Sequence, residues 1–269
     1  MGNFTFKGLF LAGLFMVLGC LSIQAADDDG LITKQITIKL EKAGTLPDKI
    51  GSTKKKQITN LKIIGEINGT DLRMIREMAG RDVNGRGTDG MLSVLDLSDA
   101  KIVEGGDYYY FNGHSDYYIL TGHNDCFTSN DKIGDSAFES CSGLTSITLP
   151  SGVTEIGKFA FLHCSGLTSI YVYAEKLPNM GSDVFDGCDA KKCTVYVPKG
   201  TYDDYWLSEF GYFENIVEFE ATGINNVVTS NDAKELSRYS VNGQRLSAPT
   251  KGLNIVKYSD GSVKKVAVQ

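Results

Sequence analysis

The sequence predicts an α/β to mainly β fold, a short right-handed solenoid with a parallel β ladder, a cap at each end and a small antiparallel β tail. The main observation is a repeat. The phrase IGDSAFESCSGLTSITL at 133–149 returns as IGKFAFLHCSGLTSIYV at 156–172, so Phe138 and Phe161 stand 23 residues apart. Such a period is typical of solenoids, in which each repeat buries its apolar face against the next. Apolar residues two apart within each copy predict a short strand with one buried face.

Apolar positions divide the solenoid, residues 58–219, into at least five coils with one strand each. At least three repeats are needed for such an array to be stable, and this count meets that requirement. The predicted strands centre on Leu61, Leu95, Ile147, Ile170 and Val195. The glycines between strands are expected where a corner needs a positive φ or a close backbone approach, namely Gly134, Gly143, Gly157 and Gly166.

Both ends of the array carry signals of caps, whose outer faces must meet water. Residues 27–57 are expected to form an N-terminal edge strand and cap, with alternating apolar residues at 36–40. Asn68 begins a helix that Gly80 ends. Downstream, Thr201 is expected to cap a short helix over 202–208, and residues 216–219 close the array.

The last stretch of the chain is predicted to be a separate unit. Residues 220–237 are polar with few large apolar side chains and are interpreted as a linker. Residues 238–269 contain Asn242-Gly243 and Asp260-Gly261, dipeptides typical of β-hairpin turns. We therefore expect a small β module of three or four strands here.

Three of the six cysteines occupy one repeat position, three residues after an equivalent Phe. These are Cys141, Cys164 and Cys188. Buried free Cys packs as a small apolar group, so we interpret the three as a column of core thiols. Zinc would require ligands that converge on one point, which a column does not provide. The sequence leaves the disulfide status of Cys126, Cys188 and Cys193 open, and no metal or cofactor is expected.

Residues 1–26 are expected to be a signal peptide. Lys7 precedes the apolar run 8–18, which is short for a membrane span, and small residues follow at 22–26. Signal peptidase could cut after Ala25 or Ala26. Alternatively, Val-Leu-Gly-Cys at 17–20 resembles a bacterial lipobox, which would make Cys20 a lipidated first residue. We expect export to the cell surface at the outer membrane or secretion, with contact to a membrane only through such an anchor.

An insertion at 104–130 interrupts the repeat and is rich in aromatic residues. Long loops in compact folds are often functional, and tyrosines suit recognition because they bury area at low entropy cost. The candidate ligand-binding residues are Tyr108, Tyr109, Tyr110, Phe111, Tyr117 and Tyr118. The alternative is that these rings pack on the solenoid flank or form a hairpin. His114 and His123 are nine residues apart, a spacing that matches no compact metal motif.

Composition excludes some function classes. The chain has 269 residues with a formal net charge of −6 and no basic block beyond Lys54–Lys56, so nucleic acid is not an expected partner. Three histidines and no nucleophile–base–orienter set make an enzyme unexpected. Paired carboxylates for glycoside hydrolysis are left open, because their distance in space does not follow from sequence.

The repeat phrases resemble the BspA-type leucine-rich repeats of bacterial surface proteins. The resemblance is carried by IGDSAFESCSGLTSITLPSGVTEIGKFAF and FLHCSGLTSIYVYAEKLP within 130–200, and more weakly by the Leu-x-x-Leu-x-Leu strand pattern at 58–104. VPKGTYDDYWLSEFGYFENIVEF resembles the terminal coil of such arrays. The resemblance implies adhesion to host matrix proteins or to other bacteria, and it implies no shared catalytic motif.

The tail phrases YSVNGQRL and KGLNIV resemble C-terminal sorting domains of the type IX secretion route. Such domains usually have more strands than this tail, so a small accessory β unit is an equal alternative.

Three functions follow as expectations. The first is an exported, adhesin-like binding protein, a monomer whose ligand is a protein or a surface glycan. The second is a structural spacer of a surface assembly, which predicts no exposed apolar or aromatic patch. The third is an exported hydrolase with an unrecognised site.

Overall fold

The computed structural model describes residues 30–111, 125–220, 235–240, 245–258 and 263–268. The chain divides into two compact units, Met1–Ala221 and Thr222–Gln269. We call the described part of the first the repeat unit and that of the second the tail unit. The signal peptide and Cys20 lie outside the described residues.

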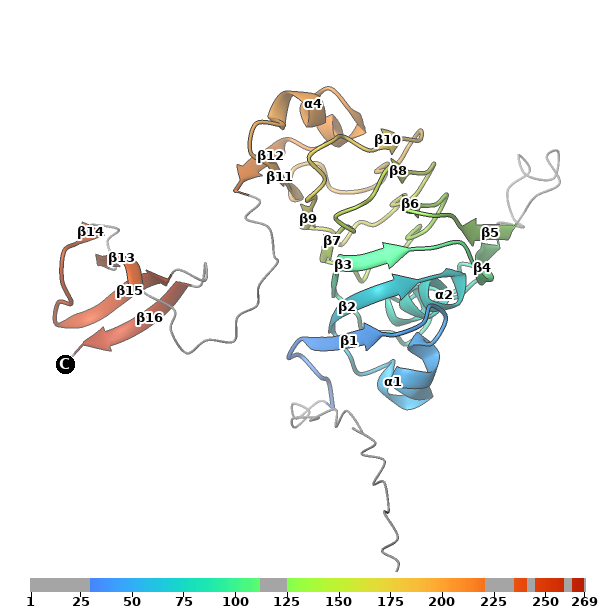
Figure 1. The fold of residues 1–269 in the computed structure, drawn as a ribbon, viewed down its shortest axis with the longest axis horizontal. Helices are drawn as coiled ribbons and strands as arrows, with labels where there is room; N and C mark the ends of the chain where they lie inside the picture. Colours follow the sequence, from blue (N-terminus) through green and yellow to red (C-terminus); the bar gives the residue numbers. More distant parts are fainter. Residues whose placement is uncertain (1–29, 112–124, 221–234, 241–244, 259–262, 269) are drawn as a thin grey trace, which may run out of the picture. The chain divides into compact units, whose positions relative to one another are not determined.

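A parallel sheet of seven strands organises the repeat unit (Figure 1). Its order along the sheet is the order of the chain: β1 (Ile36–Leu40), β2 (Asn60–Ile67), β3 (Val94–Ile102), β7 (Ser146–Thr148), β9 (Ser169–Tyr171), β11 (Thr194–Pro198) and β12 (Asn215–Phe219). The five strands predicted from the apolar spacing are confirmed, and β1 and β12 form the two edges. Each inward position, such as Leu95, Ile147 and Ile170, lies beside its equivalent on the next strand.

A second, shorter ladder runs along the array. It consists of β6 (Lys132–Ile133), β8 (Glu155–Ile156) and β10 (Asn179–Met180), all parallel. Hydroxyl groups reinforce the corner before the main sheet. Each donates a hydrogen bond of 2.9–3.2 Å to a main-chain carbonyl of the preceding coil, from Thr59 to Ile32, Ser93 to Thr59, Thr145 to Ser93 and Thr168 to Thr145. The coils are therefore joined by backbone ladders and by this hydroxyl column.

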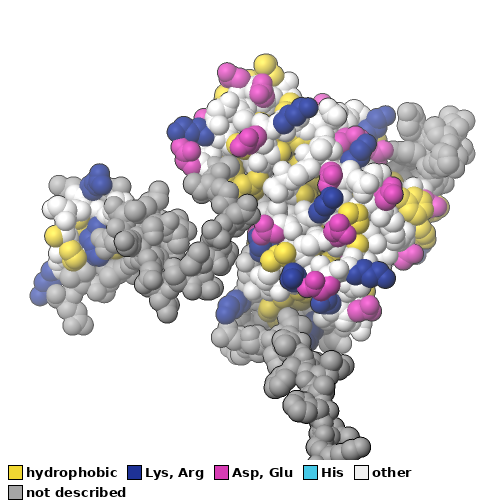
Figure 2. All heavy atoms as spheres, viewed as in Figure 1, with side chains coloured by type: hydrophobic (Ala, Val, Ile, Leu, Met, Phe, Trp, Pro, Cys, Tyr) yellow, Lys and Arg dark blue, Asp and Glu magenta, His cyan; other side chains and the backbone are white. Residues whose placement is uncertain are grey.

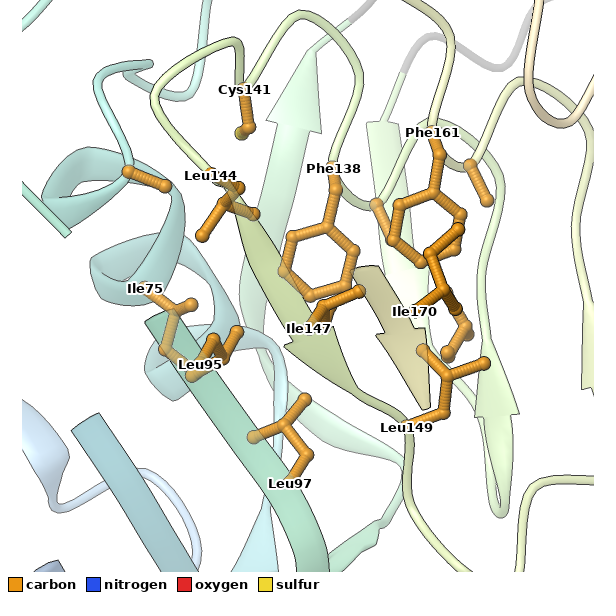
Figure 3. Packing of buried hydrophobic residues seen from close by; sticks show 14 of the residues in the cluster. Ile75, Leu95, Leu97, Phe138, Cys141, Leu144, Ile147, Leu149, Phe161 and Ile170 are labelled. Carbon is orange, nitrogen blue, oxygen red and sulfur yellow. The ribbon is translucent and has the colours of Figure 1, made fainter. Parts of the chain in front are cut away.

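The core of the regular coils is a stack of phenylalanine rings. Phe138 and Phe161 lie 5.3 Å apart with nearly parallel planes, and Phe161 and Phe185 lie 5.6 Å apart. Figure 3 shows the first two rings side by side, above Ile147 and Ile170 of the main sheet. Parallel rings at this distance are a consequence of the repeat, because each coil places the same side chain in the same position.

The predicted column of core thiols is confirmed. Cys141, Cys164 and Cys188 are buried and free. The Cys164 thiol donates to the Phe138 carbonyl at 3.0 Å and the Cys188 thiol donates to the Phe161 carbonyl at 3.4 Å, so each thiol bonds the preceding coil. Cys193 is also buried and free, and it occupies the position of Thr168 in the hydroxyl column. Burial raises the pKa of Cys164 well above its usual value.

Two corners of each coil adopt positive φ, and they do not use the glycines we expected. The first corner is Ser136, Phe159 and Asp183, and the second is Ser140, His163 and Gly187. Gly157 and Gly166 instead lie where an added Cβ would strike backbone of the preceding coil. Of the two alternatives expected for these glycines, close backbone approach is thus the one that applies, and positive φ is not. The residue types at these corners do not indicate positive φ in the sequence. The corners become recognisable only in the structure, where positive φ recurs at equivalent positions of successive coils.

Two helices cover the N-terminal coils. α2 (Gly69–Met78) begins after Asn68, as predicted, and Asn68 and Asp71 form a capping box at its start. α1 (Leu46–Lys54) was not predicted, because the positive-φ Gly51 interrupts its helical pattern; Pro47 lies in the first turn, where proline is tolerated. The buried Asp71 carboxylate accepts hydrogen bonds from the main-chain N–H of Gly44, Leu46 and Asn68 at 2.5–2.9 Å. One carboxylate therefore holds the start of both helices.

The C-terminal cap consists of α4 (Tyr202–Trp206), a short 3₁₀ helix η1 (Glu209–Tyr212) and β12. Its inward rings, Phe210 and Phe213, each lie 5.0 Å from Phe185 and close the phenylalanine stack. The expected cap by the Thr201 side chain is wrong, since that hydroxyl bonds the Pro198 carbonyl. The Glu218 carboxylate instead accepts from the N–H of Gly200 and Tyr202.

The tail unit is a four-stranded antiparallel sheet in the order β14-β13-β15-β16. The strands are β13 (Glu235–Ser240), β14 (Arg245–Leu246), β15 (Gly252–Tyr258) and β16 (Val263–Val268). This confirms a small antiparallel module. β13 begins inside the predicted linker 220–237, because a polar strand edge with an irregular register at 235–237 gives no apolar signal. Asn254 and Val256 are buried within the unit.

No helix in the described ranges is long and apolar enough to cross a membrane. Basic and acidic side chains are interspersed over the face of the repeat unit in Figure 2, rather than separated by sign.

Candidate binding surface

The ends of the aromatic insertion form an antiparallel hairpin against α2. β4 (Gly105–Phe111) pairs with β5 (Asp125–Thr128), and Phe111 lies opposite Asp125. Tyr109 is only 1% exposed and its hydroxyl donates to the Asp135 carbonyl at 2.8 Å. Tyr110 is also buried. These two candidate residues face the core, so their place in the fold is structural. Tyr117, Tyr118, His114 and His123 lie outside the described residues.

Arg76 of α2 lies beneath this hairpin with no exposed surface. Its guanidinium lies 4.4 Å from the Tyr110 ring centroid and donates to the carbonyls of Ser136 and Ala137 at 2.8 and 2.9 Å. The hairpin therefore seals a buried cation against the first regular coil. Burial raises the pKa of the neighbouring Cys126, a partly buried thiol, to about 12.

The outward face of the hairpin retains two candidate contacts. Tyr108 and Phe111 are partly exposed, and Phe127 is 54% exposed. The Tyr108 ring lies 6.2 Å from Phe127 edge-to-face and 5.2 Å from the Arg73 guanidinium. This is a small surface, since only the Phe127 ring is largely exposed to solvent.

The solvent face of the main sheet carries a larger aromatic surface. Side chains alternate along each strand, so Ile170 and Val172 point inward while Tyr171 and Tyr173 point outward. Tyr171 pairs in register with Tyr196, and their rings stack at 4.5 Å with planes 7° apart. Burial raises the pKa of Tyr171, and the neighbouring Tyr196 adds to the rise.

Strand β12 extends this surface. Val217 lies in register beside Tyr196, and Phe219 lies edge-to-face with Tyr173 at 5.0 Å. We call these five residues the sheet patch: Tyr171, Tyr173, Tyr196, Val217 and Phe219. All are partly or largely exposed. The patch therefore covers the outer face of the last three strands.

Charged and hydroxyl groups continue the same face toward the N-terminal strands. The Lys62 ammonium pairs with Asp96 at 3.0 Å and Asp99 at 2.8 Å and bonds the Ser98 hydroxyl. Burial would lower the pKa of Lys62, but hydrogen bonds to the two carboxylates outweigh it and the pKa is raised. The face thus offers an aromatic end and a charged end along one sheet.

Sequence reasoning missed the sheet patch. Its signal was present, because the period-2 pattern that places Ile170 and Val172 inward also places Tyr171 and Tyr173 outward. The sequence alone did not predict the strand register that brings Tyr196 and Phe219 beside them. No group of three or more potential metal ligands occurs within the parts of the chain that the structure describes.

The architecture of the repeat unit indicates the class of protein. The repeat unit is mostly strands with few helices, and its long parallel sheet is consistent with a leucine-rich-repeat fold. Residues 131–230 match the family model of the BspA type leucine rich repeat region, with six copies. Over those residues the chain is similar to that family, whose members are often surface proteins. Strands β2 and β3 lie before the matched range and join the same sheet. No curated protein matches this chain.

Proposed function

We propose that this protein is an exported, adhesin-like binding protein, a right-handed leucine-rich-repeat solenoid that binds a host matrix protein or a surface glycan through the outer face of its sheet. The observation that carries the proposal is the sheet patch. Stacked, partly exposed tyrosines at equivalent positions of neighbouring coils are unusual on a surface that needs only solubility. Tyrosine supplies large contact area at low entropy cost and is enriched where proteins bind.

Rigidity supports the same proposal. Tyr171 and Tyr196 stand on paired strands, and each ring is held by the other. Side chains that are already ordered lose little freedom on binding, so more of the contact energy appears as affinity. The Lys62 cluster at the other end of the face adds charges that favour one orientation of the ligand.

The spacer function is less well supported. A spacer predicts no exposed aromatic patch, whereas the sheet patch is aromatic and faces solvent. The hydrolase function remains a prediction, to be decided by assays on polysaccharide and ester substrates.

Immobilised matrix proteins and glycans test the proposal. We expect the protein to be retained on at least one matrix protein or glycan, and Tyr171→Ser with Tyr196→Ser to reduce that binding at least tenfold. Tyr108→Ser with Phe127→Ser is the matched control, since it removes two aromatic rings from the hairpin surface. Loss of binding by the control pair alone, or retention of the protein on no surface, would contradict the proposal.

The insertion is tested separately. Because Phe111 and Asp125 lie opposite each other, residues 112–124 can be replaced by Asn-Gly without removing β4, β5 or the cover over Arg76. Unchanged binding would assign the insertion a structural role, and reduced binding would support its predicted aromatic contacts.

Export forms part of the proposal and rests on residues 1–26. Mass spectrometry of the mature N-terminus would show Asp27 or Ala26 after ordinary cleavage, or an acylated Cys20 after lipoprotein processing. Retention of Met1 to Ala25 in the mature protein would exclude both. Removal of 238–269 would show in the same strain whether the tail unit directs sorting.

A further inference from the structure

The C-terminal cap exposes apolar side chains where a terminal coil should be polar. Within the described residues, the exposed large apolar side chains include five between 202 and 217 and only two elsewhere. We define the cap patch as Tyr202, Trp206, Leu207 and Tyr212. Trp206 is 45% exposed and Leu207 is 84% exposed. Capping repeats of solenoids normally present a polar outer face, so this surface needs another explanation.

The cap patch is built on a fixed support. The rings of Tyr202 and Trp206 lie one helical turn apart, with centroids 6.1 Å apart and planes 7° apart. Tyr205, between them in sequence, points inward and donates to the Ala174 carbonyl at 2.7 Å. The Tyr212 hydroxyl donates to the Cys188 carbonyl at 2.9 Å while its ring stays exposed. The patch therefore presents ordered rings whose buried neighbours hold them.

Acidic side chains surround the cap patch. Residues 201–220 contain six acidic side chains and no basic one. Glu218 is used by the backbone of Gly200 and Tyr202, and Glu220 pairs with Lys199. The other four are Asp203, Asp204, Glu209 and Glu214. All four are exposed, and no ion pair found within the described ranges involves them. Figure 2 shows acidic and hydrophobic side chains together at the α4 end of the repeat unit.

We propose that the cap patch is a second docking surface, which takes a cationic protein segment in which Arg or Lys alternates with apolar residues. Apolar side chains of the segment would lie against Leu207 and Tyr212. Its cations would lie over the Trp206 and Tyr202 rings and against the free carboxylates. Aromatic faces attract cations, and carboxylates around them add charge complementarity.

Charge argues against two other occupants. A second copy of this chain carries a net charge of −6, and a symmetric contact would place the acidic rim against itself. An anionic membrane surface would be repelled by the same rim. The sheet patch is a separate surface on the outward face of the sheet, so this proposal does not depend on the function proposed above.

Trp206 makes the proposal directly measurable, because it is the only tryptophan in the chain. The probe is a twelve-residue peptide of alternating arginine and leucine, titrated into the full protein while the emission of Trp206 is recorded. We expect a saturable change in emission. The counterpart with leucine replaced by serine should bind at least fivefold more weakly, and the counterpart with arginine replaced by glutamate should cause no change.

Charge variants separate this surface from general electrostatics. Asp203→Asn, Asp204→Asn and Glu214→Gln together should weaken peptide binding at least tenfold. The control removes three exposed carboxylates elsewhere, by Glu41→Gln, Asp48→Asn and Glu175→Gln, and should change the affinity less than twofold. Thermal melting of both triple variants checks that each still folds.

Three results would overturn the proposal. The first is an emission that does not change at millimolar peptide. The second is equal weakening by the two triple variants, which would mean attraction by net charge alone. The third is dimerisation in sedimentation velocity that Trp206→Ala with Leu207→Ser abolishes, which would assign the patch to a second copy instead.

Discussion

Arg76 is a charged side chain buried without a carboxylate ion pair among the described residues, and it shows how one residue joins three parts of the fold. It belongs to α2, stacks on Tyr110 of the hairpin and bonds carbonyls of the turn 136–139. Its Nε and the Ser136 hydroxyl have no hydrogen-bond partner in the described parts of the chain. A cation so placed must be held by dipoles and by the ring face, since burial of an unpaired charge is costly.

Arg76→Ala should therefore lower the free energy of unfolding by about 3 kcal/mol or more, because the buried carbonyls of Ser136 and Ala137 each lose the guanidinium as a hydrogen-bond donor and the Tyr110 ring loses its cation. Arg73→Ala is the matched control. It removes the neighbouring arginine of α2 from the partly exposed Tyr108 ring, and should cost about 0.5–1 kcal/mol. Urea denaturation of both variants makes the comparison. Equal losses would show that Arg76 is not the residue that joins these elements.

The left-handed corner at His163 is a second prediction at the residue scale. His163 is exposed and has a φ of 58°, which disfavours any residue with a Cβ. His163→Gly should raise stability by about 0.5–1 kcal/mol, after the larger entropy of glycine in the unfolded chain is subtracted. His163→Ala keeps the Cβ and should give no such gain. If the two variants melt at the same temperature, backbone strain at this corner is not the cause.

At the scale of elements, the strands were predictable and one helix was not. Ile147 and Leu149, like their equivalents in the next coils, are two residues apart. This period-2 pattern predicts each strand and does not depend on the residues at the corners. α1 is only nine residues long and has a positive-φ glycine, Gly51, inside it, so its local pattern is weak for a helix and tertiary contacts hold it. The principal contact is the Asp71 carboxylate, which lies 25 residues from Leu46 in sequence.

Asp71→Ala tests this contact. It removes the acceptor of three main-chain N–H groups, two of them on the segment that starts α1. We expect a loss of about 2–4 kcal/mol, since hydrogen bonds to a buried charged acceptor are among the strong ones. Asp48→Ala, which removes an exposed carboxylate in the first turn of α1, should cost less than about 1 kcal/mol. Hydrogen exchange of α1 should accelerate only in the first variant.

At the scale of the whole molecule, the sequence predicted the order of coils but not the surfaces that they create. A period of 23 residues fixes which strands become neighbours. The register across β9, β11 and β12 places Tyr196 between Tyr171 and Val217, and it also depends on the unequal lengths of the last coils. The candidate site predicted from the insertion was therefore only part of what the structure offers, and two of its rings, Tyr109 and Tyr110, belong to the core.

The buried thiols predict a pH dependence of global stability. Burial raises the pKa of Cys188 and of Cys193 to about 12, whereas a thiol in the unfolded chain titrates near about 8.5. Above that unfolded value the folded state binds more protons than the unfolded state, so stability is complete below it and is lost as pH rises. Above about pH 8.5, each thiol should lower the free energy of unfolding by about 1.4 kcal/mol per pH unit.

Denaturation between pH 8.5 and 10 measures this fall before most tyrosines titrate. Cys188→Ala and Cys193→Ala should each reduce the slope while lowering stability at pH 7, through a small cavity in both variants and, in the first, through loss of the hydrogen bond to the Phe161 carbonyl. A slope that both variants leave unchanged would mean that other groups cause the alkaline loss.

Hydroxyl-radical footprinting of the protein with a matrix protein or glycan that retains it tests the central claim most directly. If the outer face of the parallel sheet is the binding surface, oxidation of Tyr171, Tyr173 and Tyr196 falls on binding, while oxidation of Tyr108 and Phe127 is unchanged. Protection confined to the hairpin, with the three sheet tyrosines oxidised as in the free protein, would contradict it.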